Sequence, residues 1–183
     1  MYNMPLKNKT MALIRVRKTP YSGLNSFLQD VFYKQESLAD KAFILLKLIY
    51  SKKTLVTDWK LLVKELFGVE SPSSGDESLI SEACFKYLGF HRENVIASKA
   101  KLRGKKAFKD LLGNSSLEVS YRDVLLRASK WHSAVTSYYS ILNKLKALGL
   151  VEKADGYYVR SDKFLNRLSQ VNSLFEGFSN ELK

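Results

Sequence analysis

Hydrophobic residues recur at helical spacing along most of this chain. In seven stretches they fall three or four positions apart, so that they share one face of a helix. The polar run 71–78 (SPSSGDES) is typical of a loop. The pattern therefore predicts a mainly helical protein, with helices over residues 22–32, 37–52, 58–67, 78–88, 120–129, 134–148 and 162–183.

The end of the predicted helix 134–148 is the most informative stretch. Its apolar residues Tyr138, Leu142 and Leu145 share one face, and the glycine that follows is a typical helix stop. A β-prone run then turns at Ala154-Asp155-Gly156 and returns at 157–160. Asp-Gly between two β-prone runs indicates a β-hairpin. This stretch predicts a helix that leads directly into a hairpin.

The residues before this helix extend the pattern. Residues 116–119 predict a short strand, 120–129 a helix that buries Val124 and Leu125, and 130–133 a turn. The order helix, strand, helix, turn, helix, hairpin resembles the winged helix-turn-helix superfamily of DNA-binding proteins. The resemblance covers the second half of the chain and implies that 134–148 is the recognition helix.

The first half repeats the same order. Residues 55–59 (LVTDW) correspond to 117–121 (LEVSY), and 86–90 (KYLGF) correspond to 146–150 (KALGL). Val95 and Ile96 stand where a returning strand is expected. We therefore predict a mainly α fold with small β-wings. It comprises a basic arm and amphipathic helix (1–36), a first winged-helix-like unit (37–98), a second winged helix-turn-helix unit with a basic lead-in (99–161), and a C-terminal helix (162–183).

Two questions stay open in this organisation. The first unit departs from the family pattern because a long loop precedes its third helix, which carries Glu77 and Glu82. Whether that unit binds DNA or protein is not decided by its sequence. The C-terminal helix has an apolar side, which fits either a homodimer contact through terminal helices or folding back onto its own domain.

The net charge of +12 directs attention to polyanions. Nucleic acid comes first among them, and an anionic membrane surface or an acidic partner second. The charge is also clustered. Residues 1–20 contain five Lys or Arg and residues 99–109 contain six, and neither segment contains Asp or Glu. Such clustering is what a phosphate-binding surface requires.

The sequence offers little for catalysis. Cys84 is the single cysteine, and His91 and His132 are the two histidines, without metal-ligand spacing. No phosphate-loop motif and no nucleophile-elbow motif occur. We therefore predict a protein that is not an enzyme and has no cofactor and no metal. No apolar run reaches the roughly 20 residues of a membrane helix, and no signal peptide is evident. An intracellular location is expected, cytoplasmic or nucleoid-associated, or nuclear in a eukaryote.

The candidate DNA-binding residues lie in four groups. Asn and Lys bond base edges, whereas Ser, Thr and Tyr mostly bond phosphates, and no acidic residue falls between Lys130 and Lys146. A polar outer face is also what any amphipathic helix has. The candidates are Thr136, Ser137, Tyr139, Ser140, Asn143 and Lys144 on the recognition helix; Lys153 and Arg160 on the wing; Lys101, Arg103, Lys105 and Lys106 in the basic segment; and Arg15, Arg17 and Lys18 in the arm.

These observations predict a non-catalytic protein that binds double-stranded DNA, in transcriptional regulation, replication initiation or DNA partition. The alternative is a tandem winged-helix subunit that binds protein within a larger complex, of a polymerase-associated, chromosome-condensing or membrane-remodelling kind. A third class, the subunit of a nucleic-acid enzyme, would need catalytic residues from a partner.

Overall fold

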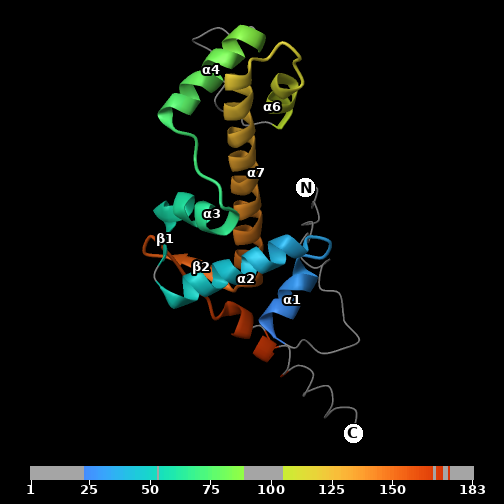
Figure 1. Ribbon diagram of the computed structural model, residues 1–183. Coiled ribbons are helices and arrows are strands. Elements are labelled where there is room, and N and C mark those ends of the chain that lie inside the picture. Colours follow the sequence, from blue (N-terminus) through green and yellow to red (C-terminus); the bar gives the residue numbers. More distant parts are fainter. Residues whose placement is uncertain (1–22, 53, 89–104, 167, 171–172, 174–183) are drawn as a thin grey trace, which may run out of the picture. The chain divides into compact units, whose positions relative to one another are not determined.

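The computed structural model describes residues 23–52, 54–88, 105–166, 168–170 and 173 (Figure 1). It is mainly helical with a small antiparallel sheet, as the sequence predicts. The helices are α1 (Leu24–Val31), α2 (Glu36–Ser51), α3 (Trp59–Phe67), α4 (Ser74–Leu88), α6 (Lys105–Leu112) and α7 (Val119–Leu148), and a 3-10 turn covers Val56–Asp58. The strands are β1 (Thr54–Leu55), β2 (Val151–Ala154) and β3 (Tyr157–Arg160).

The chain divides into two compact units that do not follow one another in sequence. The sheet unit contains residues 1–59 and 139–183, and the helical unit contains residues 60–138. This division differs from the predicted boundaries between 37–98 and 99–161. The reason is that the first and last parts of the chain contribute to one sheet.

That sheet has the strand order β1-β3-β2 and is antiparallel throughout. The predicted hairpin is confirmed: Asp155 and Gly156 both adopt positive φ, as a tight two-residue hairpin turn requires. The strand β1 lies within the predicted first winged-helix-like unit (37–98), yet it pairs with β3, with Thr54 opposite Tyr158. The two predicted units therefore share a sheet, and a strand pair so distant in sequence leaves no local signal.

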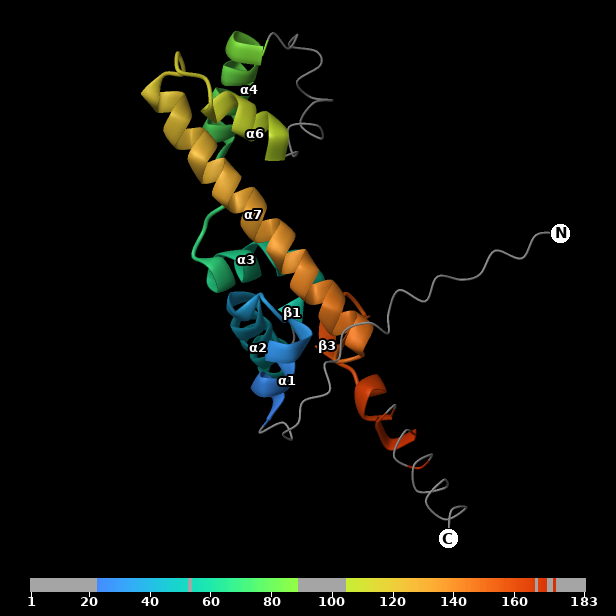
Figure 2. The same ribbon diagram turned by 90° about the vertical axis from the view of Figure 1, so that its right-hand side faces the viewer.

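The sheet unit packs α1, α2 and the end of α7 beside the strands (Figure 1 and Figure 2). Leu142 and Leu145 of α7 are buried, as their spacing predicts, together with Leu45 and Leu46 of α2. The helix α7 ends at Leu148, and the following Gly149 adopts a φ of 74°. The N–H of Leu150 donates to the carbonyl of Leu145 at 3.0 Å, and that of Gly149 to the carbonyl of Lys146 at 2.9 Å. This bond pair is a Schellman motif, which orients the chain into β2.

The helical unit packs α4 and α6 against the first part of α7 (Figure 1 and Figure 2). Its core is a small cluster, which comprises Ala83 and Cys84 of α4, Leu111 of α6, Leu117, and Tyr121, Leu125 and Ala128 of α7. The helix α4 begins at Ser74, inside the segment predicted as loop. Ser73 and Asp76 explain this start, because the hydroxyl of Ser73 accepts from the N–H of Asp76 and the carboxylate of Asp76 accepts from the N–H of Ser73.

Two predictions for the second half are wrong. The turn at 130–133 does not form, because α7 runs without interruption from Val119 to Leu148. Residues 130–133 (KWHS) contain neither Gly nor Pro, so nothing in the backbone opposes a continuous helix. The strand at 116–119 is also absent. There the amide oxygen of Asn114 accepts from the N–H of Ser116, and the resulting turn leads into α7 at Val119.

Some predicted features lie outside the described residues. They are the basic arm 1–20, the strand around Val95 and Ile96, and the basic segment up to residue 104. The C-terminal helix is described at residues 163–166, 168–170 and 173. Its beginning packs on its own unit, since the rings of Phe164 and Phe27 lie 5.4 Å apart. The homodimer stays a prediction.

Candidate nucleic-acid interface

The end of α7 presents a polar face on the sheet unit. Ile141, Leu142 and Leu145 hold this part of the helix against the core, so the opposite positions are directed outward. Ser140 and Asn143 are exposed there, and Tyr139 is 41% exposed beside them. Hydroxyl and amide groups of this kind can bond phosphate oxygens and base edges. The structure thus places three of the predicted residues on one accessible surface.

Lys144 is directed elsewhere. Its ammonium donates to the carbonyl of Val31 at 3.3 Å, at the end of α1, and lies 4.4 Å from the centre of the Phe32 ring. Burial lowers the pKa of Lys144. The cation satisfies a carbonyl at a helix C-terminus, where positive charge is favourable. Our prediction placed Lys144 on the exposed face, so this orientation is a correction, and its role as a DNA contact stays a prediction.

The hairpin carries both positive and negative side chains. Lys153 is exposed next to the turn. Arg160 lies 3.3 Å from the carboxylate of Asp162, and its guanidinium is 5.7 Å from the centre of the Tyr50 ring. The carboxylate of Glu152 accepts from Lys163 at 2.7 Å, and this bond holds the pKa of Glu152 below its usual range. Glu152 and Asp162 are therefore engaged by basic partners, whereas Asp155 in the hairpin turn is an exposed acidic residue.

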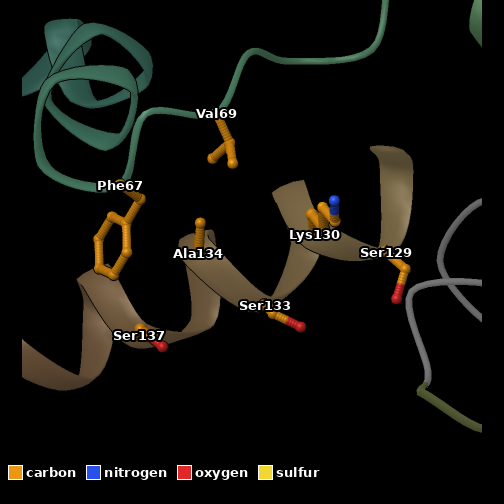
Figure 3. A pocket seen from close by; sticks show the side chains of 7 residues that line it. All are labelled: Phe67, Val69, Ser129, Lys130, Ser133, Ala134 and Ser137. Carbon is orange, nitrogen blue, oxygen red and sulfur yellow. The ribbon is translucent and has the colours of Figure 1, made fainter. Parts of the chain in front are cut away.

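The first two candidates of α7 belong to the helical unit. The hydroxyl of Thr136 donates to the carbonyl of His132 at 2.9 Å, a bond within the helix. Ser137 lines an open pocket of about 320 Å³ (Figure 3). In that view Ala134 points toward Val69, and the ring of Phe67 lies next to Ser137. The remaining lining residues are Ser129, Lys130 and Ser133. Thr136 and Ser137 are therefore described with the helical unit, whereas Tyr139, Ser140 and Asn143 are described with the sheet unit.

The candidates in the basic segments are placed only in part. Lys105 and Lys106 form the first turn of α6. Lys101, Arg103, Arg15, Arg17 and Lys18 lie outside the described residues.

Sequence reasoning missed an aromatic neighbour of the polar face. The rings of Trp59 and Tyr139 lie 6.1 Å apart with an interplanar angle of 40°. Aromatic pairs at this distance are favourable and fix the orientation of both rings. No spacing in the sequence indicates this contact, because Trp59 begins α3 and Tyr139 lies 80 positions further along the chain, in α7.

The described residues offer no metal site and no activated cysteine. Within them no group of three or more His, Cys, Asp or Glu side chains is placed to hold an ion. Cys84 is fully buried, and burial raises its pKa to about 11. A thiol with such a pKa stays protonated near neutral pH and is a poor nucleophile. Cys84 therefore acts as a core residue of the helical unit.

Comparison with protein-family models, curated proteins and solved structures finds no match for this chain. Among the described helices, none combines the length and the apolar character needed to cross a membrane.

Proposed function

We propose that this protein binds double-stranded DNA without catalysis, through the polar face of α7 on the sheet unit and the neighbouring hairpin. Ser140, Asn143 and Tyr139 contact the bases or phosphates of one groove in this proposal, and Lys153 contacts the backbone beside it. The basic segments 1–20 and 99–109 supply further phosphate contacts. Transcriptional regulation, replication initiation and DNA partition are the processes that such binding fits.

The observation that carries the proposal is the pairing of β1 with β3. Because of it, the three strands form one sheet rather than two, and they occur in the chain order α2, β1, α3, α7, β2, β3. This order resembles a single winged helix in which residues 68–133 separate the second helix from the recognition part of α7. We propose this interrupted arrangement in place of a tandem one. In helix-turn-helix proteins the recognition helix enters the major groove.

The charge distribution supports the same proposal. Between Lys130 and Lys146 the helix α7 contains no acidic residue. Glu152 and Asp162 are bonded to Lys163 and Arg160, so their charges are partly compensated. Eleven of the 30 Lys and Arg residues fall in 1–20 and 99–109, where Asp and Glu are absent from the sequence. Phosphate contacts from such clustered basic residues would add affinity that depends steeply on salt.

The test is fluorescence anisotropy of a random-sequence duplex, titrated with the full chain at several salt concentrations. We expect the logarithm of the affinity to fall linearly with the logarithm of the salt concentration, as release of several counterions requires. Asn143→Glu and Lys153→Glu should each weaken binding by about tenfold or more, since they place a carboxylate against phosphate. Both positions are exposed, so the fold should be unaffected.

A matched control is Lys64→Glu, which makes the same charge change as Lys153→Glu on an exposed residue of the helical unit. It should alter the affinity far less than Lys153→Glu. Equal affinities for the wild type, Asn143→Glu and Lys153→Glu would remove the sheet-unit face from the interface. No binding at low salt would reject DNA as the partner and favour the protein-interaction alternative.

A further inference from the structure

The sheet unit has an exposed apolar groove that is separate from the polar face of α7. It has a volume of about 610 Å³ and is lined by Leu24 of α1 and by residues of α2. Leu24 is 36% exposed and Ile44 is 45% exposed. Large apolar side chains that gather on one exposed surface are typical of a binding site. The other lining residues are Phe43, Leu46, Lys47, Leu48, Tyr50 and Ser51.

An apolar ridge lies next to this groove and is formed by Phe164, Leu165 and Leu168 at the start of the C-terminal helix. Phe164 packs on Phe27 of α1, and its N–H donates to the carbonyl of Gly149 at 3.2 Å, which fixes the start of the C-terminal helix. Leu165 and Leu168 follow on this helix and are each 51% exposed. Because Leu24 and Phe27 are three residues apart on α1, they share one side of that helix. The ridge and the groove are therefore neighbours on the same unit.

The sequence beyond the ridge matches the groove in chemistry. Apolar residues continue at the alternating four- and three-residue spacing of a paired helix, namely Phe164, Leu168, Val171, Phe175, Phe178 and Leu182. Between Leu168 and Leu182 the chain contains Glu176 and Glu181 and no Lys or Arg. The charged residue of the groove lining is Lys47. The N-terminal segment, with five basic residues and no acidic one, is the poorer match for that lysine.

We propose that the groove of one chain receives the C-terminal helix of a second copy, so that two copies exchange these helices in a homodimer. A groove and a ridge on the same unit are self-complementary, which is the condition for a two-fold interface. The occupant is a second copy because Leu165 and Leu168, in the described part of the helix, are half exposed in their own chain, and because the described residues leave the groove unfilled. This inference does not rest on DNA binding.

The experiment measures the molar mass of the full chain by light scattering over a range of concentrations, without DNA. We expect the mass of two chains. Ile44→Lys and Leu168→Glu should each weaken the dimer by about tenfold or more, since each places a charge in a buried apolar contact. Leu126→Glu is the matched control: Leu126 is 42% exposed on the helical unit, and the dimer should persist. Circular dichroism checks that every variant is folded.

Mixing the two weakened variants sharpens the test. In a mixed dimer, the unchanged groove of the Leu168→Glu chain faces the unchanged ridge of the Ile44→Lys chain, while the two new charges face one another with opposite sign. The mixture should therefore dimerise more strongly than either variant alone. A one-chain mass for the wild type would overturn the proposal and favour folding back of the helix. A two-chain mass that both substitutions leave unchanged would also overturn it.

Discussion

The sheet unit and the helical unit use different kinds of contact. In the sheet unit, long-range pairs join distant parts of the chain: β1 pairs with β3, and the hydroxyl of Tyr50 donates to the carbonyl of Leu150 at 2.8 Å. In the helical unit, a continuous stretch of the chain folds onto a small apolar cluster. The sheet unit therefore adds backbone geometry at its turns and strand pairs to its buried apolar core, whereas the helical unit depends, of these two, on side-chain packing alone.

Ion pairs add little to the stability of the helical unit. Arg127 of α7 bonds Asp76 of α4 at 2.6 Å, but the side chain of Arg127 is largely exposed. Exposed pairs contribute about 0–1 kcal/mol. Buried apolar packing, rather than exposed ion pairs, must therefore supply most of the stability of this unit.

The largest effect is expected from Leu125→Ala. Leu125 is fully buried in the cluster of the helical unit, and truncation should cost about 2–5 kcal/mol through lost burial and the cavity that remains. Hydrogen exchange should accelerate in α4 and α6 while the amides of β2 and β3 stay protected. Leu126→Ala, at the exposed neighbouring position, should change stability by no more than about 0.5 kcal/mol. Equal loss of protection in β2 and β3 would show that the two units unfold together.

Ser133→Pro tests whether α7 is continuous where we predicted a turn. Ser133 is an exposed residue in the interior of α7, and proline there removes one backbone hydrogen bond and clashes with the preceding turn. We expect a loss of about 3 kcal/mol, measured by urea denaturation. Ser133→Ala keeps the helix and should be neutral or slightly stabilising. A proline variant as stable as the wild type would support the predicted turn at 130–133.

Much of the sheet unit was predictable because its signals are local. The stop at Gly149 and the hairpin turn at Asp155-Gly156 are fixed by conformations that few residues adopt, so a single stretch of sequence indicates them. The buried face of α7 followed from the spacing of Leu142 and Leu145. The pairing of β1 with β3 was not predictable, since two residues of strand carry no partner information.

The candidate site was predicted less well than the fold. Periodicity separated the exposed Ser140 and Asn143 from the buried face, but it could not give the direction of a long side chain at the border. Lys144 illustrates this limit, because α1 offers its ammonium a carbonyl and an aromatic ring. The internal repeat misled us for a related reason, because similar short runs form different structures. The run 55–59 contains the end of β1 and the start of α3, whereas the run 117–121 contains a turn and the start of α7.

Two glycines stand at helix ends, one in each unit. Gly68 directly follows α3 and Gly149 directly follows α7, and both adopt positive φ, 65° and 74°. An added Cβ at Gly68 meets nothing within 4 Å, whereas at Gly149 it would meet the Cβ of Lys163 at 3.0 Å and the nitrogen of Phe164 at 3.1 Å. Gly68→Ala should therefore lower the free energy of unfolding by about 1–2 kcal/mol, which is the cost of the left-handed backbone conformation alone.

Gly149→Ala should cost about 1 kcal/mol more than Gly68→Ala, because the chain at Lys163 and Phe164 must move. The measurement is the free energy of unfolding from urea titration of both variants. Gly149→Ala should also release Phe164 from Phe27, which near-ultraviolet circular dichroism can detect. Equal costs for the two variants would show that the start of the C-terminal helix is not held against Gly149.

The smallest effects concern one carboxylate in each unit. The backbone N–H of Ser73, followed by the side chains of Arg127 and Ser73, holds the pKa of Asp76 below its usual range. Lys163, followed by Ser161, does the same for the pKa of Glu152. A lowered pKa in the folded state means that the unfolded chain binds more protons. The stabilisation is therefore present above the ordinary carboxyl pKa of about 4 and is lost as the pH falls through the folded value.

Salt should separate these two carboxylates. Asp76→Asn and Glu152→Gln should each destabilise the protein near pH 7, and both differences from the wild type should shrink toward about pH 3. At about 1 M salt the screening length is roughly 3 Å, so the exposed pair of Glu152 with Lys163 should lose most of its effect near pH 7. Asp76 accepts first from a backbone N–H at the start of α4, a hydrogen bond that salt weakens less. A pH-dependent effect of Asp76→Asn that vanished in salt would show that Arg127, rather than the helix start, is its main partner.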